Sequence, residues 1–183
     1  MRDISLHLMD LAQNSIAAGA RLISVDLALD ENGVLTMRIT DDGRGMTPEA
    51  AQRALGPFAT TRTTRKVGLG LPLTQANARL TGGDLTIASA PNEGTTVTCT
   101  FYTRHIDCLP LGDLAQTIAA LVAAHPDGPD IELSLTSPKG ESAFGTAETR
   151  DILHPVPLDT PEVIAWITQS LREQTDVLFG GER

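Results

Sequence analysis

The sequence predicts an α/β fold of two layers, an α/β sandwich. An apolar helical segment opens the chain, and strand-like segments with period-two alternation follow it. A further helical segment stands between two pairs of these strands. Strands that alternate apolar and polar residues bury one face, and helices with an apolar side cover such a face. With 183 residues, of which 41% are hydrophobic, the chain can bury an adequate core.

The first predicted helix covers residues 4–18, ISLHLMDLAQNSIAA. Its apolar side chains spread around most of the circumference, which is typical of a buried helix. A narrow polar strip interrupts them at spacings of four, three and four residues: Asp3, His7, Asp10 and Asn14. Residues three and four apart share a helix face. Because buried polar groups need partners, this strip is the first candidate for a binding site.

Two strands are predicted directly after this helix, at residues 21–29 and 34–40. Both RLISVDLAL and VLTMRIT alternate apolar residues with polar or small ones, as half-buried strands do. The turn between them contains the step Asn32-Gly33, a strong hairpin signal. The second strand ends at DDGRGM, residues 41–46, where the alternation stops.

A short helix is predicted next, with Thr47 as its cap and Pro48 in its first turn. Residues 50–71 lose periodicity and are rich in threonine, glycine and basic residues, so most of this stretch is expected to be a mobile loop. The elements predicted after the loop are a helix at 72–80 and strands at 85–90 and 95–102.

Residues 105–183 form a second part with a different composition. After a linker, the elements predicted here are a helix at 113–124, strands at 131–136 and 142–148, and a helix at 161–174. The whole net charge of −9 lies in this part, because residues 1–104 carry equal numbers of basic and acidic side chains. The sequence therefore predicts a first domain at 1–104 and an acidic α+β appendage at 105–183, of unknown function.

Charge, hydropathy and cysteine content exclude several classes of protein. An acidic C-terminal part argues against nucleic-acid binding, which needs a basic footprint. No apolar run is long enough to span a bilayer, and the acidic first residues do not resemble a signal peptide. Cys99 and Cys108 lack the spacing of a metal site or a disulfide framework. We therefore expect a cytoplasmic protein with neither a membrane nor a nucleic acid as partner.

Four stretches follow one another in the first part of the chain: DLAQN at 10–14, DDGRG at 41–45, PFATTR at 57–62 and GLGL at 68–71. In this order they resemble the boxes of the GHKL ATP-binding superfamily. That superfamily includes histidine-kinase catalytic domains, MutL proteins, type II topoisomerase ATPase subunits and large heat-shock chaperones. The resemblance covers about residues 4–102 and is strongest to histidine kinases. It implies a Bergerat-type ATP-binding fold, a mixed sheet with helices on one face, that binds ATP and Mg²⁺.

The resemblance implies that DDGRG holds the adenine base. The Asp41 carboxylate is expected to accept a hydrogen bond from the exocyclic amine of adenine, which selects ATP over GTP. Gly43 and Gly45 lack a Cβ atom and are expected to let the base approach the backbone. Further residues that the resemblance places at the nucleotide are Met46, Phe58, Thr61, Arg62, Leu69, Leu71 and Thr96.

Other residues are expected at the metal and the phosphates. Asn14 offers a hard amide oxygen suited to Mg²⁺, which takes its remaining ligands from water and phosphate. Gly68 and Gly70 precede a predicted helix, and the N–H groups at a helix N-terminus bind phosphate. Basic residues of the loop, Arg62 among them, either close on the phosphates or form a solvated basic loop. No P-loop and no G-x-G-x-x-G motif occurs in the chain.

Asp10 is the predicted catalytic residue. In ATP-hydrolysing branches of the superfamily, the position four before the asparagine is a glutamate that activates water or a hydroxyl. Aspartate is shorter by one methylene, and a general base must come within about 2.6–3.2 Å of its proton. Asp10 is therefore expected to be a slow base, to act through a water, or to orient the Mg²⁺ shell. His7 is expected to hydrogen-bond Asp10 or to be a satisfied surface histidine.

Three functions stay open. The favoured one is a stand-alone histidine-kinase-like or anti-sigma-type protein kinase in signal transduction, acting on a separate partner protein. It is favoured because too few residues precede the 10–14 stretch for the phosphoacceptor hairpin of a sensor kinase. The alternatives are an ATPase and a nucleotide-gated protein-binding module with little turnover. ATP and a protein substrate or regulator are the expected partners, and a homodimer is left open.

Overall fold

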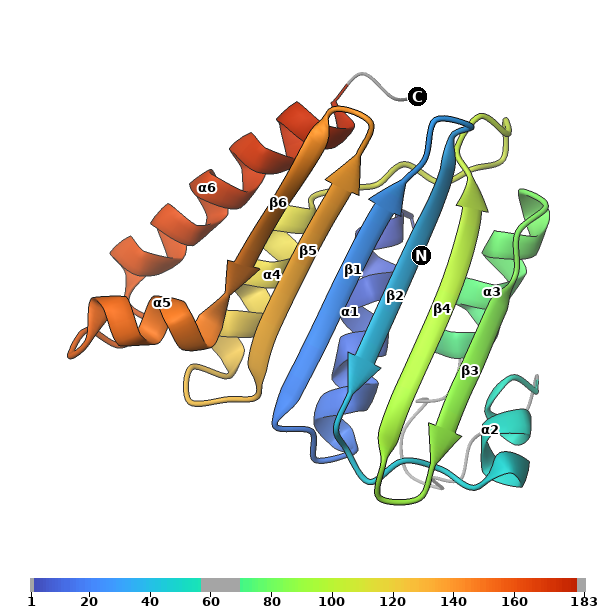
Figure 1. Cartoon of the computed structure of the whole chain (residues 1–183), viewed down its shortest axis with the longest axis horizontal. Helices are drawn as coiled ribbons and strands as arrows, with labels where there is room; N and C mark the ends of the chain where they lie inside the picture. The colour runs from blue at the N-terminus through green and yellow to red at the C-terminus, as the bar shows by residue number, and fades with distance from the viewer. Residues whose placement is uncertain (1, 57–69, 181–183) are drawn as a thin grey trace.

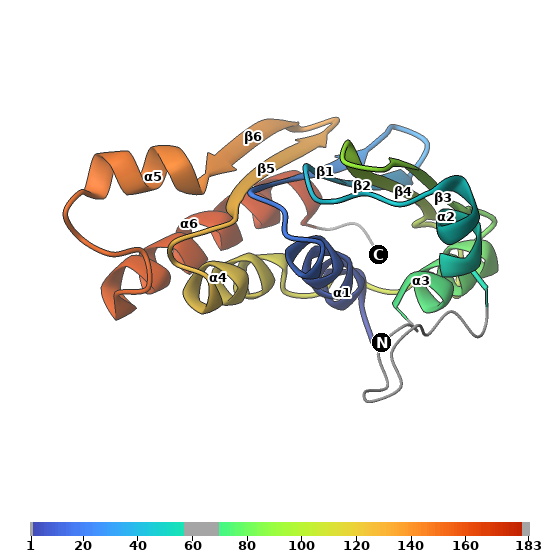
Figure 2. The same cartoon turned by 90° about the horizontal axis from the view of Figure 1, so that it is seen from below.

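The computed structural model describes residues 2–56 and 70–180 (Figure 1). The helices on one face of the sheet are α1 (Ile4–Ala17), α3 (Gly70–Leu80), α4 (Leu114–Ala124) and α6 (Pro161–Phe179) (Figure 2). Two shorter helices, α2 (Pro48–Ala54) and α5 (Thr146–Leu153), lie at opposite edges of the sheet. The predicted two-layer α/β sandwich with a mixed sheet is confirmed. No helix in the described part of the chain is long and apolar enough to cross a membrane.

The sheet has six strands in the order β3-β4-β2-β1-β5-β6. Their bounds are β1 (Leu22–Leu29), β2 (Val34–Asp41), β3 (Leu85–Ala90), β4 (Gly94–Tyr102), β5 (Asp130–Ser137) and β6 (Gly140–Gly145). Neighbouring strands are antiparallel except β1 and β5, which pair in parallel with Leu22 opposite Asp130. The sheet therefore continues across residue 104, and the C-terminal strands extend it at the β1 side (Figure 1).

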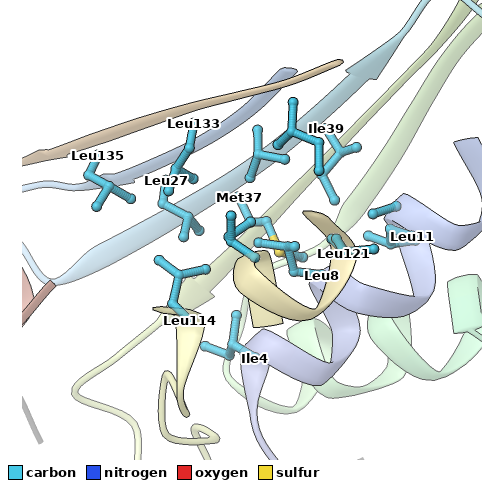
Figure 3. Close-up of a cluster of buried hydrophobic side chains, with 14 of the residues drawn as sticks. Ile4, Leu8, Leu11, Leu27, Met37, Ile39, Leu114, Leu121, Leu133 and Leu135 are labelled. Atoms are coloured by element: carbon cyan, nitrogen blue, oxygen red, sulfur yellow. The ribbon is translucent and has the colours of Figure 1, made fainter. Parts of the chain in front are cut away.

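One hydrophobic core joins the two parts of the chain. Leu8 and Leu11 of α1 lie in the same buried cluster as Leu121 of α4 and Leu133 of β5 (Figure 3). Each of these four side chains is at most 3% exposed. Burying a leucine contributes about 1.5–3 kcal/mol, so the contacts of α4 and β5 stabilise the sheet that carries α1.

Several predicted boundaries differ from the structure. Helix α3 begins at Gly70 rather than at residue 72, and α6 extends to Phe179 rather than 174. The strand predicted at 142–148 is wrong over its second half, because β6 ends at Gly145 and α5 begins directly after it. The Thr146 hydroxyl accepts the backbone N–H of Ile131 at 2.8 Å. This side-chain bond replaces the next backbone bond of the β5–β6 ladder and ends the strand.

Helix α1 is amphipathic rather than buried on all sides. Leu8 and Leu11 are buried, whereas Leu6 is 41% exposed and both Asp10 and Asn14 are exposed. Helices α3 and α4 flank α1 beneath the sheet and leave part of its outer surface uncovered (Figure 2). The predicted acid and amide are therefore accessible to a ligand.

Candidate functional site

Helix α1 connects the two ends of the candidate site. At its middle, Asp10 lies beside the start of α3, since a Cβ atom built on Gly70 would be 3.3 Å from Asp10 Cβ and Oδ2. Five residues later, Ser15 hydrogen-bonds Asp41 at the end of β2. A helix rises 1.5 Å per residue, so the two contacts are roughly 7.5 Å apart along the helix axis. The Asp10 end is defined as Asp10, Asn14 and Gly70, and the Asp41 end as Asp41, Ser15, Gly43, Gly45 and Thr95.

The carboxylate at the Asp41 end is buried and already oriented by the protein. Asp41 is 8% exposed. Its Oδ2 accepts a hydrogen bond from Ser15 Oγ at 2.7 Å, and its Oδ1 accepts one from Gly43 N at 2.9 Å. An ionised carboxylate has about four acceptor positions. Asp41 therefore keeps the capacity to accept an N–H donor from a ligand while its orientation is fixed.

The glycines after Asp41 are required by the protein's own packing. Gly45 has a φ of +63°, and a Cβ atom there would lie 1.9 Å from the Ala90 carbonyl oxygen. A Cβ atom on Gly43 would lie 2.9 Å from the Cβ of Ala18. The packing gives these two glycines a structural reason of their own, and the approach of a base to their backbone stays a prediction. Their close packing holds the loop after Asp41 against α1 and the β3–β4 hairpin.

Asp42, next to Asp41 in sequence, has a different role. Its Oδ1 accepts the backbone N–H groups of Arg21 at 2.7 Å and Leu22 at 2.9 Å. These two bonds hold the pKa of the Asp42 carboxyl below its ordinary value. Asp42 therefore anchors the start of β1, and only the first aspartate of DDGRG belongs to the site.

Thr95, rather than the predicted Thr96, shares the sheet face of Asp41. Asp41 pairs with Thr95 across β2 and β4, while Thr96 pairs with Thr40, and the hydroxyls of that pair are 3.2 Å apart. Because successive side chains of a strand point to opposite faces, Thr96 lies on the face away from Asp41. The expectation for Thr96 is therefore corrected by one residue to Thr95.

Met46 is held at the same end through the hairpin. Ser89 Oγ accepts the backbone N–H of Met46 at 2.8 Å and lies 2.9 Å from Thr95 Oγ1. Met46 itself is half-buried. Ser89 and Thr95 carry no motif signal in the sequence, although the strand alternation and the β2–β4 register together bring Thr95 to Asp41.

The Asp10 end combines an exposed acid, an exposed amide and a helix N-terminus. Asp10 and Asn14 are one turn apart on α1. Desolvation by surrounding atoms raises the pKa of the Asp10 carboxyl, which makes it a better proton acceptor near neutral pH. Gly70 opens α3, whose first N–H groups lack helical partners and attract anions. Leu71 is partly buried against the core beside it.

The donor chemistry at this end fits Mg²⁺. The exposed Asn14 side chain offers the amide oxygen that a magnesium ion takes alongside phosphate and water. Among residues 2–56 and 70–180, no three His, Cys, Asp or Glu side chains gather around a common point. Five predicted site residues lie outside the described residues: Phe58, Thr61, Arg62, Gly68 and Leu69.

Both expectations for His7 are wrong. The side chain has no exposed surface, and its partners are Thr74 and Asn77 of α3 rather than Asp10. Burial lowers the pKa of His7 to about 4. The helix wheel places His7 on the face of Asn14, but α3 covers His7 and leaves Asn14 exposed. The sequence held one signal for these partners: Thr74 and Asn77 are polar residues three apart within the predicted helix 72–80, so they share a helix face.

The fold is a two-layer α/β sandwich in which α1 joins the Asp10 end to the Asp41 end. The family described as histidine kinase-, DNA gyrase B-, and HSP90-like ATPase matches residues 2–105. This is more than half of the chain, and the chain belongs to this family. The predicted membership of the GHKL superfamily is confirmed, and so is the Bergerat-type ATP-binding fold that it implies. The match ends where the acidic C-terminal part begins.

Curated relatives point to the histidine-kinase branch. The chain is 31% identical over 114 residues to the cell-division control histidine kinase PdhS of Brucella anthropi, which covers 55% of this chain and 11% of that protein. It is 33% identical over 116 residues to the non-motile and phage-resistance protein of Caulobacter vibrioides, and the match covers 58% of this chain and 14% of that protein. An uncharacterized sensor-like histidine kinase of Rhizobium meliloti is 37% identical over 100 residues, covering 51% and 19%. The chain thus matches less than a fifth of each relative's length.

Proposed function

We propose that the protein binds ATP with Mg²⁺ and acts as a protein kinase of the histidine-kinase-like or anti-sigma type on a separate partner protein. The observation that carries the proposal is the buried Asp41 carboxylate, oriented by Ser15 and Gly43 and aligned by α1 with the exposed Asp10 and Asn14. The family membership and the histidine-kinase relatives support it.

Asp41 would recognise the base. Its open acceptor positions suit the exocyclic amine of adenine, whereas guanine presents a carbonyl oxygen at that position. Two acceptors facing each other in a buried site leave both unpaired, which costs about 1–3 kcal/mol. The site is therefore expected to prefer ATP to GTP by about tenfold or more.

Asn14 would hold Mg²⁺, and the first N–H groups of α3 would bind phosphate oxygens. When bound, Mg²⁺ neutralises charge on the phosphates and orients them. Asp10 lies on the α1 turn beside Gly70 and would accept the proton of an attacking hydroxyl, imidazole or water. His7 is buried with both ring nitrogens bonded, so it is not a phosphoacceptor.

Calorimetry with the full chain tests the nucleotide assignment. We expect MgATP to bind and MgGTP to bind at least tenfold more weakly. Equal affinities for the two nucleotides would refute the role of Asp41. Incubation with ATP labelled at the γ-phosphate, together with candidate partner proteins, tests the reaction, and a labelled partner is the expected result.

The alternative functions are an ATPase and a nucleotide-gated module with little turnover. One observation favours the gated module: the position of the activating carboxylate holds an aspartate, which is shorter than a glutamate by one methylene. Steady phosphate release without a partner identifies the ATPase. ATP binding with neither phosphate release nor a labelled partner identifies the gated module.

The acidic residues 105–183 are proposed to dock the partner. They carry the entire net charge of the chain, and they form the β5–β6 side of the sheet, away from α2 and α3 (Figure 1). A basic partner surface complements such a segment. Because the cytoplasm supplies ATP and Mg²⁺, we place the protein there. Partner binding that weakens as salt is raised is the expected result.

A further inference from the structure

A series of hydrogen bonds through the buried His7 and Thr74 links α1 to the first turn of α3. His7 Nδ1 lies 2.8 Å from Thr74 Oγ1, and His7 Nε2 lies 2.8 Å from Asn77 Nδ2. Thr74 Oγ1 in turn donates to the carbonyl oxygen of Gly70 at 2.8 Å. His7 and Thr74 have no exposed surface. The series of hydrogen bonds from His7 through Thr74 therefore ends at Gly70, the residue of α3 that lies against Asp10.

The direction of every bond in this series follows from its atoms. An amide nitrogen only donates, so Asn77 donates to His7 Nε2. The Thr74 hydroxyl has one proton and gives it to Gly70, so it must accept from His7 Nδ1. The partners at the two ring nitrogens of His7 thus require the same neutral tautomer, with the proton on Nδ1. Burial, which lowers the pKa of His7 to about 4, keeps this form at neutral pH.

The geometry points to His7 as a positioning residue for the nucleotide site: through Thr74 it holds the first turn of α3 at the position where Gly70 meets Asp10. This inference rests on the proposed function, because the turn that it holds is the proposed phosphate site. Among the described residues, the hydrogen-bond partners of His7 are Thr74 and Asn77 rather than Asp10, and its side chain is buried, so its effect on the site would pass through α3. Within the described residues no buried side-chain nitrogen or oxygen lacks a partner, and a shift of α3 along α1 would break bonds at both ring nitrogens.

Two threonines of the same region provide a matched pair of variants. Thr74 and Thr81 are both buried, at 0% and 4% exposure. Each donates to a helical carbonyl at 2.8 Å, Thr74 to Gly70 and Thr81 to Ala78. Each also accepts one bond from another element, Thr81 from the backbone N–H of Tyr102. Thr81 follows the last turn of α3, away from the proposed phosphate site.

The experiment compares Thr74→Val with Thr81→Val. Both substitutions keep the side-chain shape, and we expect similar losses of unfolding free energy. Only Thr74→Val is expected to weaken MgATP binding, by fivefold or more in calorimetry, and Thr74→Ser is expected to restore it. Equal affinity losses in the two valine variants, or unchanged affinity in a folded Thr74→Val protein, would overturn the positioning role.

A second measurement needs no nucleotide and separates this inference from the proposed function. Nitrogen-15 NMR of the full chain at pH 7 reports which ring nitrogen of His7 is protonated. We expect Nδ1–H in the wild type and in Thr81→Val, because the partners at both ring nitrogens require it. Protonation at Nε2 in the wild type refutes the hydrogen bonds assigned from His7 through Thr74 to Gly70. Nδ1–H in a wild-type protein that binds no MgATP refutes both the proposed function and the positioning role, and leaves only the hydrogen-bond chain.

Discussion

At the Asp41 end, the carboxylate proposed to bind the base is itself buried, and the protein forms hydrogen bonds to it directly. At the Asp10 end, the carboxylate is exposed, and the buried polar contacts lie behind it, between His7 and α3. Asp41 is oriented by a hydroxyl and a backbone N–H from its own surroundings. Asp10 depends for its geometry on how one helix is seated against another.

This difference matches the role that is proposed for each end. Recognition of a flat base needs a fixed acceptor, and a buried carboxylate with two bonds supplies one without rearrangement. Phosphate and metal chemistry needs access to solvent and ligands, so its side chains cannot be held by burial. We infer that the exposed end is supported instead by the hydrogen bonds from His7 through Thr74 to Gly70, which lie behind it. Changes to Gly45, His7, Asp10 and Asp41 test this contrast.

Gly45→Ala tests how rigid the Asp41 end is. It should be the most damaging change, because the added methyl group has no room there. Its Cβ atom would lie 1.9 Å from the Ala90 carbonyl oxygen at a φ of +63°. We expect a loss of about 3 kcal/mol or more of unfolding free energy in urea titration. Gly19→Ala is the control, since its φ is +77° but nothing lies within 4 Å; it should lose about 1 kcal/mol. Equal losses would contradict close packing at Gly45.

Acid should weaken the protein through His7. The pKa of His7 is about 4 in the folded protein, against its ordinary value of 6.5. Between these pH values the unfolded chain therefore binds a proton that the folded chain does not bind. Stability therefore falls as the pH drops from about 6.5 to 4, by roughly 3 kcal/mol, and this loss is absent above pH 6.5. Urea titrations of the wild type and His7→Gln across this range measure it. Parallel pH curves for the two proteins would show that His7 is not the titrating group.

Asp10→Ala tests the exposed acid at the other end. We expect turnover to fall about a hundredfold, the scale of a lost general base, and ATP affinity to change by less than about threefold. Gln13→Ala, an exposed neighbour on α1, is the control and should keep both. Phosphate release and transfer assays give the first quantity and calorimetry the second. Unchanged turnover in Asp10→Ala would exclude Asp10 as the base.

Asp41→Asn tests the buried acceptor. The variant keeps the size of the side chain but presents an N–H₂ group where one oxygen stood, so ATP affinity should fall by about tenfold. Asp42→Asn removes a carboxylate one residue away that bonds only the start of β1 among the described residues. It should lose stability but keep ATP affinity. A calorimetric affinity for Asp41→Asn equal to that of the wild type would refute the adenine assignment.

Local pattern was sufficient for most of the fold. Period-two alternation predicted β1 to β5 within two residues at either end, and Thr47 caps α2 as expected, with its hydroxyl accepting from Ala50 N. The short helix α5 was missed because eight residues give only two turns of helical period. The side-chain bond that ends β6, from Ile131 to Thr146, joins residues fifteen apart and has no local signal.

The class of fold, the order of the motifs and the candidates Asp41, Asn14 and Asp10 could be predicted from the sequence, because they depend on periodicity and short spacing. Which residues become the neighbours of these candidates depends on the folded protein. The register between β2 and β4 places Thr95, rather than Thr96, on the sheet face of Asp41, since a shift of one residue moves a side chain to the opposite face. The position of α3 buried His7 and left Asn14 exposed on the same helix face. Such contacts join residues far apart in the chain, and no local pattern encodes them.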